Sequence, residues 1–238
     1  MKDAFTLAEV LITLGVIGIV AAITISPLIA NHKEKVLVTR VKKAYSEFQN
    51  SLELYAAQNN CNDISCISDT NQTSEELTKK LFKQFNGAKY CRDANIFWKS
   101  KCTSSSMKHN TPYYRDGVTS EIGIFTPSFI SANGVAYMVV QYSSCPEVFI
   151  NYKRDENGNI LLDKDGNPVT YTYTSDVCAR FYFDANGTNS GPNQYGADIY
   201  IFDLNSKGKL SSIYGYINPV LTNGKLEYTP YELGKEKK

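Results

Sequence analysis

The sequence predicts an α+β protein in which a long N-terminal helix packs on an antiparallel β-sheet. Apolar residues first run without a charge and then recur at helical spacing, and short strand-like runs separated by turn residues follow from about Glu121. The chain has 238 residues, 42% of them hydrophobic, which suffices for one sizeable folded domain. We therefore expect a helix whose first half spans a membrane and whose amphipathic second half lies on the domain.

The first element is the charge-free run of residues 10–30, whose length of about twenty residues lets a helix cross the hydrocarbon core of a bilayer. Three interpretations are open from hydropathy alone. The run is a secretory signal peptide cut near Ala21 or Ala30, an ordinary membrane anchor, or a helix that keeps a second role in the mature protein. The choice depends on the residues in front of the run.

Residues 4–12 read AFTLAEVLI. This segment resembles the prepilin family, in which a small leader residue, usually Gly, precedes Phe-Thr-Leu-x-Glu and a hydrophobic stretch. Ala4 stands in the place of that Gly. The resemblance, which extends to about Tyr55, implies a type IV pilin or a type II secretion pseudopilin with a pilin-like fold.

The resemblance also implies how the chain is processed. A prepilin peptidase, which is a membrane aspartyl peptidase, would cut between Ala4 and Phe5 and methylate the new amino terminus. Residues 1–4 are then a leader, residues 5–30 a transmembrane assembly helix, and residues 31–238 an extracytoplasmic domain that includes the second half of the long helix. Pro27 stands close to a proline that commonly kinks the helix in this family, so we expect a kink there.

Glu9 is the one carboxylate at the head of the apolar run, and an ionised carboxylate inside a bilayer costs several kcal/mol. A positive amino terminus at Phe5 would lie one helical turn away, and the resemblance implies that Glu9 pairs with the Phe5 amine of a neighbouring subunit. The alternative is that Glu9 only occupies the helix start, where a negative charge favours the helix dipole.

The second half of the helix begins at about Glu34. Its charged residues fall largely on the other side of the helix from its apolar residues, which recur at spacings of three and four as Leu37, Val41, Ala44, Tyr45, Phe48, Leu52 and Tyr55. Thr73 and Glu76 form a capping box that predicts a short second helix. Strands are expected at 122–125, 135–142, 148–152, 171–173, 181–183, 199–204 and 210–216, and residues 155–168 are expected to form a projecting hairpin.

The cysteines all follow the apolar run and form no zinc-binding pattern, which favours disulfides outside the cytoplasm. Fifteen pairings are possible for six cysteines. Proximity in sequence favours Cys61 with Cys66 and Cys91 with Cys102, which leaves Cys145 with Cys178.

A polar segment between two predicted strands concentrates oxygen ligands, of which we single out Asp184, Asn186, Asn189 and Asp198. Hard oxygen donors suit Ca²⁺, although the spacing is not that of an EF-hand. Some pseudopilins bind calcium in such a loop, so the resemblance makes Ca²⁺ a candidate cofactor. The alternative is a set of Asx and Gly turns that only joins two strands.

Catalysis is not implied by the sequence. Two histidines, His32 and His109, cannot form a multi-histidine metal site, and the formal net charge of +1 does not favour nucleic acid as a partner. The resemblance implies a structural subunit whose partners are other pilin-like subunits, the peptidase, membrane lipid and an assembly platform in the inner membrane. Its location would be that membrane, and after assembly a surface filament or a periplasmic pseudopilus. Two alternatives remain: a minor subunit that binds a surface, secreted cargo or DNA at a filament tip, and a membrane-anchored enzyme.

Overall fold

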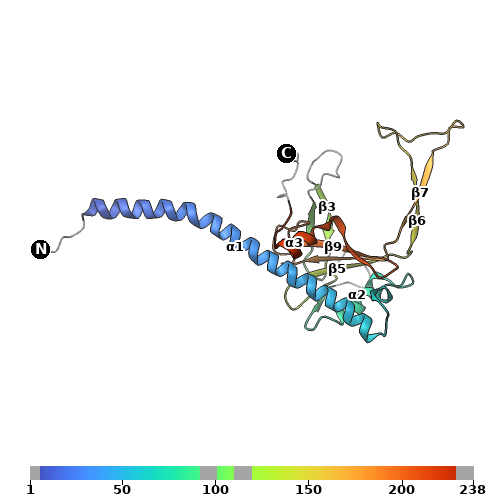
Figure 1. Cartoon of the computed structure of the whole chain (residues 1–238), viewed down its shortest axis with the longest axis horizontal. Helices are drawn as coiled ribbons and strands as arrows, with labels where there is room; N and C mark the ends of the chain where they lie inside the picture. The colour runs from blue at the N-terminus through green and yellow to red at the C-terminus, as the bar shows by residue number, and fades with distance from the viewer. Residues whose placement is uncertain (1–5, 92–100, 110–119, 229–238) are drawn as a thin grey trace.

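The structure is a computed structural model and describes residues 6–91, 101–109 and 120–228. Ala4 and Phe5 lie outside the described residues. Within the described part, one long helix runs out of a domain built around an antiparallel sheet (Figure 1). The expected α+β class is therefore confirmed.

Helix α1 (Leu7–Gln58) is a single uninterrupted element. Residues 10–30 are exposed almost throughout, whereas the second half packs on the domain and buries residues such as Val41, Phe48 and Leu52. Figure 1 shows the helix axis bending between these two halves. Pro27 lies inside the helix. A proline inside a helix removes one backbone donor and pushes on the preceding turn, which gives this bend a physical cause.

The helix ends at Asn59, whose side-chain amide donates to the Tyr55 carbonyl, and a 3₁₀ turn η1 (Ile64–Ile67) follows. Helix α2 (Ser74–Phe82) then begins at Thr73 with the expected capping box: Thr73 accepts from the Glu76 N–H, and the Glu76 carboxylate accepts from the Thr73 N–H at 2.7 Å. Leu77 and Leu81 of this helix are buried in the core.

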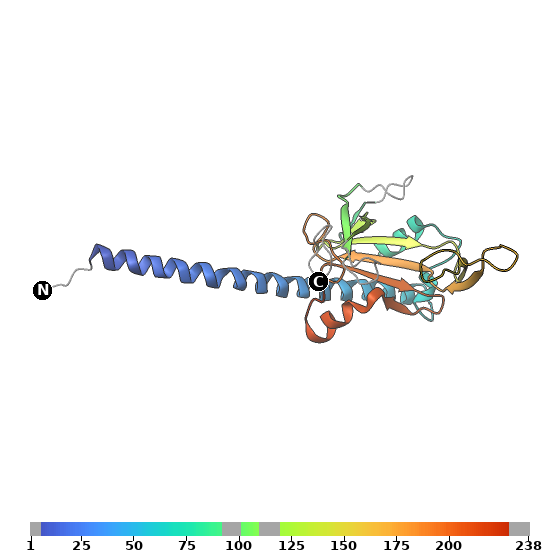
Figure 2. The same cartoon turned by 90° about the horizontal axis from the view of Figure 1, so that it is seen from above.

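The main sheet has six antiparallel strands in the order β1-β4-β5-β8-β9-β10. The strands are β1 (Lys89–Tyr90), β4 (Phe129–Ile130), β5 (Ala136–Gln141), β8 (Ala179–Asp184), β9 (Ile199–Leu204) and β10 (Leu210–Ser212). Figure 2 shows α1 along one face of this sheet. The hairpin of β2 (Ser105–His109) and β3 (Ser120–Phe125) lies on the opposite side.

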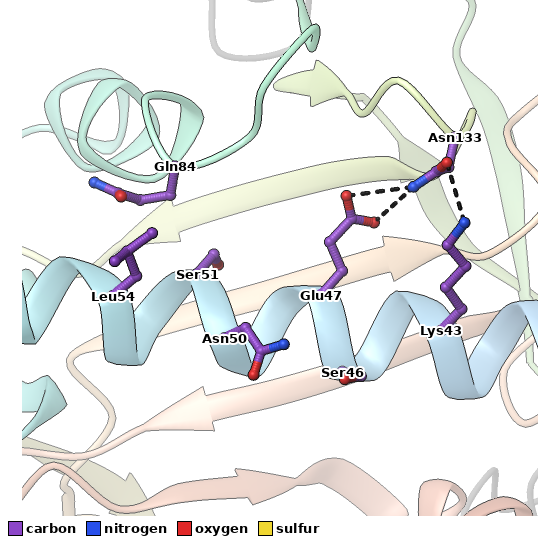
Figure 3. Close-up of a pocket in the computed structure, with 8 residues that line it drawn as sticks. All are labelled: Lys43, Ser46, Glu47, Asn50, Ser51, Leu54, Gln84 and Asn133. Atoms are coloured by element: carbon purple, nitrogen blue, oxygen red, sulfur yellow. Dashed lines mark hydrogen bonds between the residues drawn. The ribbon is translucent and has the colours of Figure 1, made fainter.

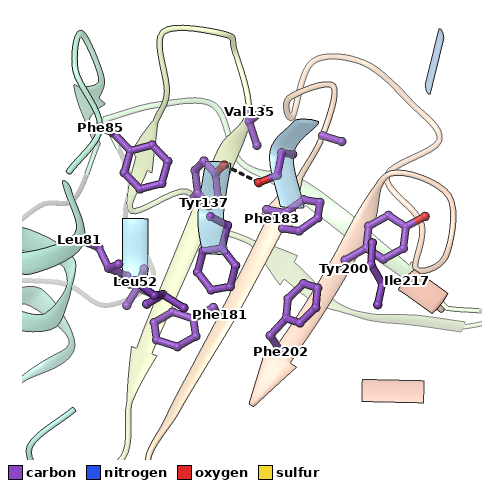
Figure 4. Packing of buried hydrophobic residues seen from close by; sticks show 14 of the residues in the cluster. Leu52, Leu81, Phe85, Val135, Tyr137, Phe181, Phe183, Tyr200, Phe202 and Ile217 are labelled. Carbon is purple, nitrogen blue, oxygen red and sulfur yellow. Dashed lines mark hydrogen bonds between the residues drawn. The ribbon is translucent and has the colours of Figure 1, made fainter. Parts of the chain in front are cut away.

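Aromatic side chains fill the space between α1 and the sheet (Figure 4). Alternate residues of each central strand face the helix, as strand geometry requires, so Phe181 and Phe202 meet Phe48 at ring-centroid distances of 5.2 and 5.7 Å. The Tyr137 hydroxyl donates to the Ala44 carbonyl, which gives this buried polar group a partner. A second apolar cluster, on the other face, contains Met107, Phe125, Met138, Tyr195 and Ile201.

A separate ribbon projects from the domain, and we call residues 147–175 the arm. It consists of β6 (Glu147–Tyr152) and β7 (Thr170–Ser175), paired with Phe149 opposite Tyr173. Figure 1 shows it standing away from the sheet, and the Cys145–Cys178 disulfide closes its base. The expected single hairpin at residues 155–168 is instead two successive tight turns, each closed by an aspartate, Asp155 and Asp163.

The favoured disulfide pairing is the one in the structure: Cys61–Cys66, Cys91–Cys102 and Cys145–Cys178. Most expected strands are present within a residue or two of their expected ends. The strand expected at 210–216 is wrong beyond Ser212, because the chain there turns through η2 (Ile213–Gly215) into a helix that was not expected, α3 (Ile217–Asn223). Val220 of α3 is fully buried, so tertiary packing outweighs the local strand preference.

Candidate functional site

The start of α1 is organised by Thr6 and Glu9. Thr6 is the N-cap; its backbone N–H and hydroxyl both donate to Glu9 Oε2, at 2.9 and 2.8 Å. In return Thr6 Oγ1 accepts from the Glu9 N–H at 3.3 Å. Within the described part of the chain, Glu9 Oε1 has no hydrogen bond. Thr6 was not singled out from the sequence, although its spacing from Glu9 is that of a capping box.

The residues after Glu9 form an apolar surface with nothing from the domain against it. Leu14, Ile17 and Ile23 are 62, 62 and 69% exposed, and between Val10 and Ala30 the chain carries no charge. Among the described residues, α1 is the one helix long and apolar enough to cross a membrane. Thr13 and Thr24 satisfy their hydroxyls on the helix itself, by donating to the carbonyls of Glu9 and Val20. An exposed apolar surface of this extent calls for lipid or for other helices.

The second candidate is the loop between β8 and β9, residues 184–198, which we call the polar loop. Asp184 is the last residue of β8, and Asp198 immediately precedes β9, so strand pairing brings both carboxylates to the same end of the sheet. Both residues are fully buried. Asp198 accepts from the backbone N–H groups of Asn193 and Gln194, and Asp184 accepts from that of Asn186.

Burial disfavours a charge on either carboxylate. It raises the pKa of Asp184 to about 8, with a further contribution from the negative charge of Asp198, and it raises the pKa of Asp198 to about 6. Two such groups at one place are stable only if a proton or a cation neutralises part of their charge.

Amide and carbonyl oxygens complete this cluster. The Asn193 side-chain amide lies 3.2 Å from Asp184 Oδ2 and 3.1 Å from the Ser190 carbonyl oxygen, and with its nitrogen toward them it donates to both. If the amide were turned by 180°, its oxygen would lie beside Asp184 Oδ2 and the Ser190 carbonyl oxygen. The buried Asn186 Oδ1 has no hydrogen-bond partner. An orphaned oxygen and a convergence of oxygen atoms fit a hard cation such as Ca²⁺.

The structure therefore brings together three of the four residues singled out for metal binding: Asp184, Asn186 and Asp198. Asn189 lies exposed on the polar loop. Asn193, which belongs to the same polar segment but was not singled out, occupies the position next to Asp184. No spacing rule finds it, because its place depends on the turn at Asn193, whose φ is +53°.

A shallow groove of about 420 Å³ lies between α1 and the segments that carry Gln84 and Asn133 (Figure 3). Lys43 donates to the Asn133 side-chain oxygen at 3.2 Å, and the Asn133 amide nitrogen donates to Glu47. Leu54 and Gln84 line its other end. These side chains tie α1 to the β4–β5 turn, and they do not form a nucleophile, a base and an orienting group of the kind that catalysis needs.

Comparison with known proteins adds no relative: no protein-family model, no curated protein and no solved structure matches the chain.

Proposed function

We propose that this chain is a membrane-held structural subunit of the type IV pilin or type II secretion pseudopilin kind, which polymerises through the first half of α1. One observation carries the proposal: a helix that is part of the domain core in its second half continues outward as an exposed, charge-free rod headed by a single carboxylate. In a bilayer lipid covers the rod, and in a filament the rods of other subunits cover it.

Glu9 would set the register between subunits. Removal of residues 1–4 by a prepilin peptidase would leave an amine at Phe5, next to the Thr6 cap. Glu9 Oε2 accepts hydrogen bonds from Thr6, while Oε1 is available for the Phe5 amine of a neighbouring subunit. Pairing of the two charges in an apolar surrounding lowers the cost of burying either of them.

Intact-mass and N-terminal analysis of the membrane-extracted protein tests the processing step. We expect a mature chain that starts at methylated Phe5. A start near Asn31 would remove the rod and contradict the proposal, as would a working filament that retains Met1.

Two substitutions separate the two roles of Glu9. Thr6→Ala removes the hydroxyl that caps the helix but leaves the carboxylate, whereas Glu9→Ala removes the carboxylate and leaves Thr6 Oγ1 able to accept from the backbone N–H of residue 9. If Glu9 pairs with a neighbouring amine, Glu9→Ala abolishes filaments in electron micrographs of sheared cells while the precursor stays in the membrane, and Thr6→Ala still assembles. Equal defects in the two variants would mean that Glu9 acts only as a cap.

A tip-binding role is the second candidate, and the arm favours it. The arm presents apolar side chains to solvent, and eight of them are at least 39% exposed: Val148, Ile150, Tyr152, Ile160, Leu161, Leu162, Tyr171 and Tyr173. Exposed apolar surface on a projecting ribbon is typical of recognition. Immunogold labelling restricted to filament ends would support this role, and continuous labelling along the filament would support the major structural role.

We also propose that the polar loop binds Ca²⁺ through Asp184, Asn186, Asn193 and Asp198, with the Ser190 carbonyl. The cation would neutralise the two buried carboxylates and so hold β8 and β9 together at their ends. Micromolar to millimolar Ca²⁺ is expected to raise the melting temperature of the chelator-treated protein. Asp198→Asn is expected to abolish that rise, and Asp163→Asn, in a tight turn of the arm, is the matched control that keeps it.

A further inference from the structure

A second surface of the molecule faces the place where α1 would leave the bilayer. A cavity of about 600 Å³ lies between α1 and the polar loop, and we call it the basic groove. His32, Lys33 and Arg40 line its helix side. None of the described residues that line it is acidic, and neither Lys33 nor Arg40 forms a salt bridge with a described residue. The charge of the groove therefore suits an anion.

The position of the groove along α1 matches the headgroup layer. Residues 10–30 are about the length that spans the hydrocarbon core, so His32 and Lys33 follow in the first turn beyond it. Arg40 lies two turns farther on, about 10 Å along the axis. Helical side chains lean toward the helix N-terminus, so the Arg40 guanidinium reaches back toward the membrane.

The walls of the groove indicate which anion fits. Val36 and Leu37 form an apolar strip on α1 among the basic residues, and Val36 is 39% exposed. The polar loop closes the opposite side with Ser190 and Asn186. Basic groups suit a phosphate, and an apolar strip between them suits the glycerol and acyl part of a lipid. Free phosphate would gain nothing from that strip.

We propose that the basic groove binds the phosphodiester headgroup of an anionic phospholipid, with Lys33 and Arg40 as its principal ligands. This inference rests on the membrane-held state of the proposed function. Bound in this way, the domain sits against the bilayer surface in a defined orientation, and the lipid must be released when the subunit enters a filament.

The test uses the full chain in nanodiscs of phosphatidylcholine with and without phosphatidylglycerol. Native mass spectrometry of the ejected protein counts the phosphatidylglycerol molecules that it retains. The test variant is Lys33→Gln with Arg40→Gln. Its control is Lys35→Gln with Lys42→Gln, which removes the same charge at nearly the same depth. The seven-residue spacing keeps each pair on one face of α1, and the offset of two residues between the pairs puts the control on the opposite face.

Each basic residue near an anionic membrane surface contributes roughly fivefold to binding, and both variants lose that general attraction equally. We expect the groove variant to retain at least about fivefold less phosphatidylglycerol than the control, since only it loses direct contacts to the phosphate. Equal retention by the two variants would overturn the proposal.

Titration of inorganic phosphate into the chain in neutral detergent distinguishes the source of the anion. We expect phosphate at the concentration of the lipid not to displace phosphatidylglycerol, and displacement at that concentration would overturn the assignment to lipid. Insertion into pure phosphatidylcholine discs and filament formation are scored separately. If the chain inserts and assembles but the groove variant retains as much phosphatidylglycerol as the control, only the proposal of lipid binding in the groove is refuted. If the chain does not insert, the proposed function is refuted.

Discussion

At the scale of single residues, the sequence identified groups by chemical type and the fold decided which of them meet. Glu9 stood out because a lone carboxylate heads an apolar run, and Asp184 and Asp198 because they border a polar segment. Their burial and the approach of Asn193 could not be predicted, since both depend on how β8 and β9 pair and on one left-handed residue in the loop. The ion pair of Arg180 with Asp203, at 2.6 Å, likewise needs the strand register.

The polar loop should make stability fall with rising pH when no divalent cation is present. The unfolded aspartates ionise near pH 4, whereas burial in the folded state raises the pKa of Asp184 to about 8 and that of Asp198 to about 6. The native state thus binds more protons between these values, and the free energy of unfolding decreases as pH rises through them.

Urea titrations in chelator at pH 5 and pH 8 measure this effect. Asp184→Asn cannot ionise and should flatten the dependence. A wild-type protein that is more stable at pH 8 than at pH 5 under these conditions would contradict the prediction.

Phe48 is the residue of α1 on which the aromatic core depends most directly. It is 1% exposed and contacts the rings of Phe181 and Phe202. Phe48→Ala leaves a cavity that the sheet cannot fill, and we expect a loss of about 3–5 kcal/mol in the free energy of unfolding. Leu54→Ala, on the same helix but 46% exposed, is the control and should cost less than about 1 kcal/mol in the same denaturant titration.

At the scale of elements, periodicity predicted the long elements and failed on the short ones. The apolar spacing in residues 34–55 predicted the buried face of α1, and the capping box predicted the start of α2. Strands β1 and β4 have two residues each, too few for an alternation to be visible. Helix α3 was missed because the apolar residues just before it, such as Ile213 and Tyr216, continue the apolar pattern of β10. The burial of Ile217 and Val220, which accompanies the helix, is visible only in the folded structure.

The tip of the arm should be dispensable for folding. Its turns at Asp155 and Asp163 are closed by backbone donors from their own segments, and Leu161 bonds to Lys153 in the arm itself. Replacement of residues 154–168 by Asn-Gly joins Lys153 to Val169, which are hydrogen-bonded across the ribbon. We expect the stability of the domain to change by less than about 0.5 kcal/mol in thermal melts. A large loss would show that the tip belongs to the core.

At the scale of the whole molecule, the helix-on-sheet arrangement was predictable, and the order of the strands was not. A face of apolar side chains on the second half of α1 requires a partner, and the only strand-rich segment follows it, so their packing could be expected. The sheet order β1-β4-β5-β8-β9-β10 skips the arm and the β2–β3 hairpin. Turn residues indicate that two consecutive strands are connected. They do not indicate whether that pair of strands belongs to the main sheet.

The domain should be stable without the membrane-facing rod. Because no described side chain of residues 10–30 belongs to the buried core, a chain that starts at Asn31 should melt within a few degrees of the full chain in the same neutral detergent. Circular dichroism at a helical wavelength follows both melts. A drop of ten degrees or more would mean that the rod supports the domain.

The passage of α1 from the exposed rod into the aromatic core without a break has a mechanical consequence. A pulling force on the β-sheet domain is transmitted to the apolar end of the chain through one continuous helix. No flexible linker lies between the two. Such a pull would load the packing of Phe48 against Phe181 and Phe202 in shear, because α1 lies along the face of the sheet.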